Sequence, residues 1–195
     1  MKLEGEMNMS NVLVSGGAGY LGSVLVPTLL NVEHKVTVLD NFMYNQHSLL
    51  DQCSNPNLEI VRGDVRDEKL MLKLMVGQDF IIPLACIVGM SACKAKPVEA
   101  RQVNLEAVRF IMDNRAKGQK VIFPSTDSGY GTMSKGSKCD EKTMQRPISL
   151  YGKLKTEAEQ YVLMGFDTVT LRLGTVFGMS PRMRSDLLIN DFTIR

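Results

Sequence analysis

The chain has 195 residues, of which 44% are hydrophobic and 23% are charged, so it can bury one sizeable core without disulfide staples. Its 23 basic and 21 acidic residues give a formal net charge of +2 and are scattered along the chain, which argues against a nucleic-acid partner. No apolar run approaches the length of a membrane span, and residues 1–9 lack the apolar stretch of a signal peptide, so we expect a cytoplasmic protein with no membrane partner and a loose leader at 1–9.

Six short β-rich runs alternate with helix-like stretches along the rest of the chain. Alternation of this kind favours a parallel sheet, and right-handed crossovers then place helices on both of its faces. The sequence therefore predicts a doubly wound (Rossmann) α/β domain over residues 10–178, in which the polar stretch 131–147 borders a site. The predicted strands are 11–15, 35–40, 58–63, 79–85, 120–125 and 168–174, and the predicted helices are 20–30, 67–76, 98–117 and 149–163.

A glycine-rich stretch lies between the first predicted strand and the first predicted helix. Gly16, Gly19 and Gly22 satisfy the pattern GxxGxxG, and Gly17 completes GxGxxG. Glycines here permit a tight turn and let backbone N–H groups approach a pyrophosphate at the start of the helix. Asp40 ends the second predicted strand, where a carboxylate can accept hydrogen bonds from the adenosine ribose and would repel a 2′-phosphate. This combination favours a dinucleotide site over an ordinary turn, and NAD over NADP.

Tyr151 and Lys155 lie four residues apart on a predicted helix, and therefore on one face of it. A tyrosine is a poor base near neutral pH because its pKa is about 10. A nearby ammonium group and the positive nicotinamide of an oxidised cofactor would lower that pKa and make the phenol usable as an acid or base. Spacing alone favours an ordinary exposed pair, so the catalytic interpretation depends on the rest of the chain.

Eight segments together resemble the extended short-chain dehydrogenase/reductase superfamily, in its NAD-dependent sugar-nucleotide epimerase/dehydratase branch. The resemblance covers nearly the whole chain, and the segments occur in the order typical of that branch. They are GGAGYLG (16–22), LDN (39–41), GDVRD (63–67), PLA (83–85), VNLEA (103–107), PSTDSGYG (124–131), YGKLK (151–155) and LRLGTVFG (171–178).

The resemblance implies a role for each matching position. Thr126 would hydrogen-bond the reacting hydroxyl, and Tyr151 would remove its proton as hydride leaves for the nicotinamide. Lys155 would hold the nicotinamide ribose and depress the Tyr151 pKa. The glycines would hold the pyrophosphate, and the acidic strand ends would hold the adenosine. The implied set for the cofactor NAD is Gly16, Gly19, Tyr20, Leu21, Gly22, Asp40, Asn41, Asp64, Val65, Leu84, Ala85, Tyr151 and Lys155.

One departure from the family pattern indicates which reaction to expect. The family's 4,6-dehydratases carry a glutamate base where this chain has Ser128, and serine cannot easily serve as that base. The resemblance therefore favours an NAD-dependent epimerase of a UDP-, GDP-, CDP- or dTDP-linked sugar, in which Asp127 would hydrogen-bond either the substrate or simply solvent. The alternatives are a dehydratase or NAD(P)-linked reductase of the same superfamily, or a non-catalytic NAD-binding module or fragment.

Residues 179–195 resemble the start of a C-terminal substrate-binding region, so we expect a truncated chain. Within this stretch, Arg182 and Arg184 could face a substrate phosphate or simply solvent. The helices at 98–117 and 149–163 are candidates for pairing into a homodimer, by analogy with the family. The four cysteines have no CxxC spacing and no histidine companions, so we expect free thiols and no metal site.

Overall fold

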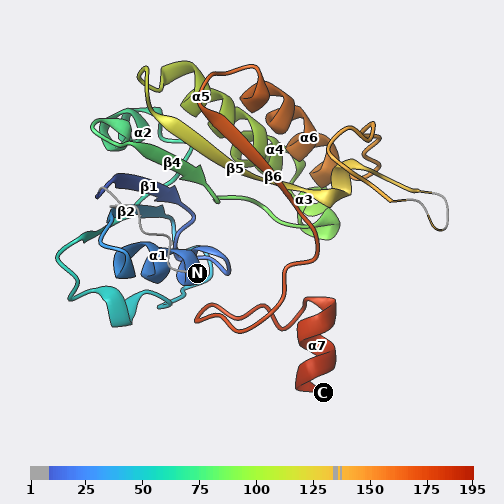
Figure 1. Ribbon diagram of the computed structural model, residues 1–195. Coiled ribbons are helices and arrows are strands. Elements are labelled where there is room, and N and C mark those ends of the chain that lie inside the picture. The colour runs from blue at the N-terminus through green and yellow to red at the C-terminus, as the bar shows by residue number, and fades with distance from the viewer. Residues whose placement is uncertain (1–8, 134–135, 137) are drawn as a thin grey trace, which may run out of the picture.

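The structure is a computed structural model that describes residues 9–133, 136 and 138–195 (Figure 1). Residues 1–8 of the expected leader, and three residues of the polar stretch 131–147, lie outside this description. Among the described residues, no helix is both long and apolar enough to cross a membrane.

A single sheet of six parallel strands forms the centre of the molecule (Figure 1). The strands are β1 (Asn11–Ser15), β2 (Lys35–Asp40), β3 (Leu58–Arg62), β4 (Phe80–Pro83), β5 (Lys120–Thr126) and β6 (Thr168–Leu173). Their order across the sheet is β3-β2-β1-β4-β5-β6, which is the doubly wound order that reverses between β1 and β4. The predicted fold class is confirmed. All six predicted strands are present, and no strand end differs from its predicted position by more than two residues.

Side chains alternate between the two faces of the sheet and build a separate core on each. On β1, Leu13 belongs to one buried cluster, whereas Val12 and Val14 belong to the other, as the two-residue repeat of a strand requires. One core packs α1 (Gly22–Asn31) against the sheet. The opposite core packs α2 (Glu68–Met75), α5 (Ala107–Asn114) and α6 (Leu150–Leu163), and Figure 1 shows these helices on the face away from α1.

One predicted helix is interrupted, two helices were not predicted, and the other predicted helices have ends within two residues of those expected. The predicted helix 98–117 is divided into α4 (Pro97–Arg101), a π-helical turn (Gln102–Glu106) and α5, which ends at Asn114. Two short helices were not predicted, α3 (Met90–Ala95) and α7 (Leu188–Ile194), because six or seven residues give too few turns for a clear periodicity. Single 3₁₀ turns lie at Leu50–Gln52 and Asp127–Gly129.

Candidate active site

The turn between β1 and α1 lies so close to neighbouring backbone that only glycine fits at two of its positions. Gly16 has φ +73°, and a Cβ there would lie 2.5 Å from the backbone nitrogen of Ala85. A Cβ at Gly22 would lie 2.5 Å from the Gly17 Cα. The ends of β1 and β4 therefore approach at backbone contact, with Leu84 N–H donating to the Ser15 carbonyl at 2.8 Å. The sequence pattern located this turn correctly.

The N-terminus of α1 is open toward this turn. No side chain caps the helix, and its first turn contains no acidic residue. Within the described residues, the N–H groups of Tyr20 and Leu21 donate to no protein acceptor. Uncapped N–H groups at the positive end of a helix are a ready site for an anion such as a phosphate.

Asp40 lies beside this turn at the end of β2, and only 8% of its surface is exposed. One carboxylate oxygen accepts from Ala18 N–H at 3.0 Å, and the other accepts from Phe42 N–H at 2.8 Å and Gln46 Nε2 at 3.3 Å. These bonds fix the carboxylate against the glycine-rich turn. Since the two oxygens offer about four acceptor positions, one remains for a further donor.

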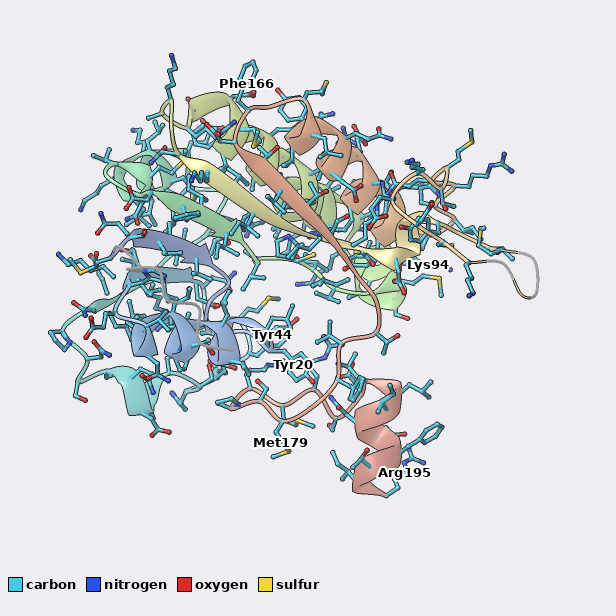
Figure 2. All side chains as sticks on the ribbon, in the orientation of Figure 1. Tyr20, Tyr44, Lys94, Phe166, Met179 and Arg195 are labelled. Carbon is cyan, nitrogen blue, oxygen red and sulfur yellow. The ribbon has the colours of Figure 1, made fainter. Side chains whose placement is uncertain are left out.

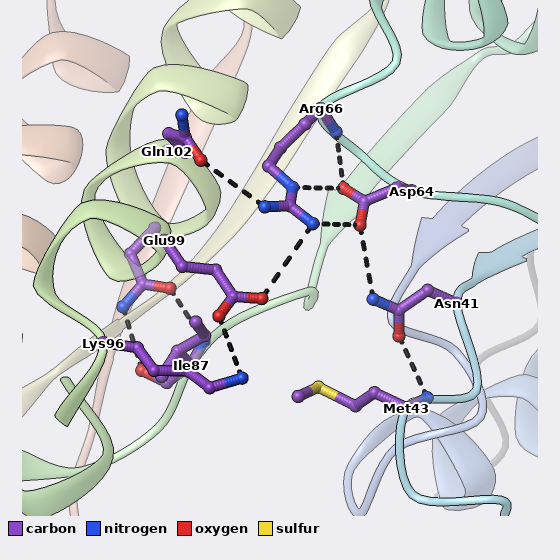
Figure 3. Close-up of polar contacts among 9 residues, drawn as sticks. Asn41, Met43, Asp64, Arg66, Ile87, Lys96, Glu99 and Gln102 are labelled. Carbon is purple, nitrogen blue, oxygen red and sulfur yellow. Dashed lines mark hydrogen bonds and ion pairs between the residues drawn. The ribbon is translucent and has the colours of Figure 1, made fainter.

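A second polar group joins the ends of β2 and β3 to α4 (Figure 3). Arg66 donates hydrogen bonds to both carboxylate oxygens of Asp64, from Nε at 2.8 Å and from Nη2 at 2.7 Å. Asn41 Nδ2 donates to the same carboxylate at 3.4 Å. The Arg66 guanidinium continues to Gln102 Oε1 at 3.4 Å and to Glu99 at 3.9 Å. The side-chain hydrogen bond from Arg66 lowers the Asp64 pKa to about 2, so this carboxylate is ionised at neutral pH.

The residues around Asp64 differ in what they expose. Its neighbour Val65 is 8% exposed and packs in the core. Arg66, in contrast, was not identified from the sequence. Its position two residues after Asp64 within GDVRD was the available signal.

The three residues expected to carry the chemistry lie together at the end of β5. Thr126 is the last residue of that strand, and its side chain lies close enough to Tyr151, in the first turn of α6, to lower the pKa of that phenol. Ser149 starts α6 by accepting from Gly152 N–H at 3.0 Å, which fixes where Tyr151 enters the site. One turn later, the buried Lys155 donates from Nζ to the Pro124 carbonyl at 2.5 Å.

The surroundings of Tyr151 in this structure favour the neutral phenol. Burial raises the Tyr151 pKa well above its ordinary value of 10, and the hydrogen bond to Thr126 only partly opposes this effect. Burial likewise lowers the pKa of Lys155. Lys155 Nζ is directed at the Pro124 carbonyl and lies 3.9 Å from the centre of the Phe123 ring, and the expected effect of Lys155 on the Tyr151 pKa stays a prediction.

Asn104 holds the loop that follows β4, and its role was missed by sequence reasoning. It is 1% exposed and lies in the π-helical turn. Its Oδ1 accepts from Ile87 N–H at 2.8 Å, and its Nδ2 donates to the Ile87 carbonyl at 2.9 Å. The thiols of Cys86 and Cys93 also donate to that carbonyl. Asn104 thereby positions the stretch from Leu84 to Ile87 next to the glycine-rich turn.

The candidate substrate residues lie in two places. Asp127 follows Thr126 directly, and its Oδ1 is 3.4 Å from Thr126 Oγ1. Arg182 and Arg184 lie instead near the glycine-rich turn. The Arg182 guanidinium is 4.4 Å from the centre of the Tyr44 ring, and Arg184 forms a two-pronged ion pair with Asp186 at 2.6 Å.

Comparison with known proteins gives a family and several relatives. The model of the NAD dependent epimerase/dehydratase family matches residues 12–192. The UDP-N-acetyl-alpha-D-glucosaminuronate decarboxylase of Bacillus cytotoxicus is 30% identical over 181 residues, which cover 88% of this chain and 56% of that protein.

Two solved structures are similar over most of this chain. The UDP-N-acetylglucosamine 4-epimerase from Methanobrevibacter ruminantium superposes with a TM-score of 0.81 and 30% identity, covering 92% of this chain and 59% of its own. DesIV, a dTDP-glucose 4,6-dehydratase from Streptomyces venezuelae with NAD and TYD bound, superposes with a TM-score of 0.84 and 27% identity, covering 94% and 61%. The chain thus spans between 56% and 61% of the length of these three proteins.

Proposed function

The chain belongs to the NAD-dependent epimerase/dehydratase family, and from this membership we propose that it binds NAD and inverts one carbon of a nucleotide-linked sugar. The observation that carries the proposal is the meeting of Thr126, Tyr151 and Lys155 at the end of β5. This end of the sheet is also where the uncapped start of α1 lies, so that a phosphate site and an acid–base group share one edge of the sheet.

The residues at the end of β1 and β2 fit a dinucleotide. The N–H groups of Tyr20 and Leu21 would bind the pyrophosphate, and Gly16 and Gly22 leave the close approach open. Asp40 would accept from a ribose hydroxyl with its remaining acceptor position. The adenosine side of the same cleft would be lined by Asn41, Asp64, Val65, Leu84 and Ala85.

The proposed chemistry is proton transfer by the chain combined with hydride transfer to and from the cofactor. When bound, NAD supplies a centre that accepts hydride from the sugar carbon and returns it to the opposite face. Thr126 would hold the reacting hydroxyl, and Tyr151 would take its proton on the phenolic oxygen. Because burial raises the Tyr151 pKa, the phenol needs positive charge close by before it can act as a base, and Lys155 one turn away is the chain's own source of it.

Ser128 supports epimerisation over dehydration. Its backbone N–H donates to Thr126 Oγ1 at 3.2 Å, and its side chain offers only a hydroxyl where the family's dehydratases carry a carboxylate base. A 4,6-dehydratase is the second candidate, because Asp127 lies beside Thr126 as the acid of that reaction would. The two reactions are separated by the mass of the product, since dehydration releases one water and epimerisation leaves the mass unchanged.

The proposed substrate is a nucleoside diphosphate sugar. UDP or dTDP is favoured over GDP or CDP as its nucleotide, because the names of the relatives contain UDP- and dTDP-linked sugars. Arg182 and Arg184 are the proposed contacts of its phosphates, because guanidinium groups pair well with phosphate oxygens.

Calorimetric titration tests the cofactor first. We expect the 195-residue chain to bind NAD more tightly than NADP. A panel of UDP- and dTDP-linked sugars, titrated in the presence of NAD, then tests the substrate class. Failure of both dinucleotides to bind would contradict the proposed function.

The variant Asp40→Ala tests the ribose contact directly. We expect it to weaken NAD binding by about tenfold, since a charge-assisted hydrogen bond contributes about 1.5 kcal/mol, and to narrow the preference for NAD over NADP. Asp51→Ala, an exposed aspartate on the 3₁₀ turn that follows the same strand, is the matched control. An unchanged preference in Asp40→Ala would remove this carboxylate from the ribose site.

A further inference from the structure

The C-terminal segment, defined as residues 178–190, folds back onto the turn between β1 and α1. The Tyr20 hydroxyl donates to the Gly178 carbonyl at 2.7 Å and accepts from Asn190 Nδ2 at 3.0 Å. Ser180 Oγ donates to the Tyr20 carbonyl at 2.8 Å and lies 2.8 Å from the Ser23 hydroxyl. In Figure 2, the labelled Tyr20 lies beside this segment, with Met179 on the segment's far side. Side chain and backbone of Tyr20 are therefore both used to hold it.

Asn190 completes this contact from within the segment. It is a buried polar residue, 4% exposed. Its Oδ1 accepts from Gly178 N–H at 2.9 Å, and its Nδ2 also donates to the Arg184 carbonyl at 3.0 Å. Asn190 thus ties both ends of the segment to the Tyr20 hydroxyl, and a buried network whose members are satisfied is costly to break.

The same contact determines where two cationic side chains lie. Arg182 lies over the Tyr44 ring in the loop after β2, and the Arg184 guanidinium is paired with Asp186. Both guanidinium groups therefore belong to a segment that is hydrogen-bonded to Tyr20 and Ser23 at the start of α1.

We propose that Tyr20 is a positioning residue, whose hydroxyl holds the segment carrying Arg182 and Arg184 against the turn that offers its N–H groups to the cofactor. Its side chain then serves the substrate region, and only its backbone serves the dinucleotide. Docking of the segment and binding of a dinucleotide at the turn become linked, because each orders the same few residues, and such linkage is reciprocal. This linkage rests on the proposed function, whereas the holding role of the Tyr20 hydroxyl does not.

Hydrogen exchange of the 195-residue chain, measured by mass spectrometry without cofactor, tests the holding role. Tyr20→Phe should raise the exchange rate of residues 178–190 about tenfold and leave β1 and β2 unchanged, since it removes two hydrogen bonds at this site only. Tyr161→Phe is the matched control, because it removes a phenolic hydrogen bond to Asp113 on the opposite side of the sheet. Equal exchange of the segment in the two variants would overturn the proposal.

The variant Asn190→Ala distinguishes a shared contact from two independent ones. If the Tyr20 hydroxyl acts through Asn190, Tyr20→Phe should add less than twofold to the exchange rate of Asn190→Ala. Full additivity of the two effects would show that the residues act separately and would contradict the shared contact, because the Tyr20 hydroxyl also bonds directly to the Gly178 carbonyl.

Addition of NAD tests the linkage. NAD should slow exchange of residues 178–190 at least threefold in the unaltered chain and clearly less in Tyr20→Phe. Binding of NAD by calorimetry without any protection of the segment would overturn the linkage. Absence of NAD binding would instead contradict the proposed function, and the comparison of Tyr20→Phe with Tyr161→Phe would still decide the holding role.

Discussion

Tyr151 is the side chain on which the proposed chemistry depends, and its surroundings favour the neutral phenol. Burial raises its pKa, while the Thr126 hydroxyl offers a hydrogen bond in the opposite sense. The phenol is therefore a stable proton donor in the isolated chain. It would become a base only when positive charge is brought next to it, which couples proton transfer to the presence of the oxidised cofactor.

Tyr151→Phe should abolish proton transfer while leaving cofactor binding nearly intact. The phosphate and adenosine groups of NAD would contact other residues, so NAD affinity should change less than twofold by calorimetry. Hydride transfer, followed by nicotinamide absorbance with the sugar found in the titration panel, should fall by about 10²–10⁴-fold. Tyr130→Phe is the control and should retain activity, because the Tyr130 hydroxyl donates to the Asp140 carbonyl and is not one of the three residues Thr126, Tyr151 and Lys155. Full activity of Tyr151→Phe would disprove the mechanism.

Asp64 should make a stabilising contribution that depends on pH. Its folded pKa of about 2 lies below the ordinary value of 3.8, so the contribution is fully present above about pH 4 and is lost as the pH falls toward 2. We expect Asp64→Asn to lower the free energy of unfolding by about 1 kcal/mol at pH 7, a figure that allows for solvent screening of the partly exposed Arg66.

Urea denaturation at pH 7 and at pH 3 measures this effect. The difference between Asp64→Asn and the unaltered chain should shrink at the lower pH. Arg66→Gln should show the same pH dependence, because it removes the partner of the same carboxylate. A difference that is constant with pH would show that the ion pair does not set the Asp64 pKa.

Among the secondary-structure elements, the π-helical turn Gln102–Glu106 has the clearest consequence for the site. It lies where the sequence predicts an unbroken helix, and it turns Asn104 toward the loop after β4. The N–H and the carbonyl of Ile87 both bond to this one side chain. A π-helical turn of this kind often marks a functional region.

Asn104→Ala should destabilise the chain by about 2 kcal/mol, because it leaves the buried N–H and carbonyl of Ile87 without this partner. Asn114→Ala is the control, since Asn114 is exposed at the end of α5 and its side chain donates to the Phe110 carbonyl of the same helix. It should cost less than about 0.5 kcal/mol. Urea denaturation followed by circular dichroism compares the two. Equal losses of stability would refute a specific role for Asn104 in holding the loop.

At the scale of the whole molecule, the parallel sheet determines where the site is. The carboxyl ends of its strands meet at one edge, and the strand order reverses between β1 and β4, where ligands of such sheets bind. Residues from Gly16 to Lys155 are brought together there, although they are far apart in the sequence. A mutation that changed the strand order would therefore remove the site altogether.

The pairing of two chains through α5 and α6 remains a prediction. These helices pack side by side, and Arg109 of α5 forms an ion pair with Glu157 of α6 at 2.8 Å. We expect sedimentation velocity to give a dimer at micromolar concentration. A monomer at these concentrations would contradict the prediction. So would a dimer whose α5 and α6 show no protection from hydrogen exchange relative to the dissociated chain.

The sequence by itself determined the alternation of strands and helices, the glycine-rich turn, and the position of Asp40 at a strand end. These features are local, since periodicity and glycine spacing act over a few residues. The resemblance to a family then singled out Thr126, Tyr151 and Lys155, which the structure brings together.

Only the tertiary structure decided the rest. The bond between Tyr20 and Asn190 joins residues 170 positions apart, and Asn104 reaches Ile87 from a different element. The direction of Lys155 Nζ depends on the Pro124 carbonyl across the interface between β5 and α6. Such contacts depend on how whole elements pack against one another, and local sequence patterns carry no information about that packing.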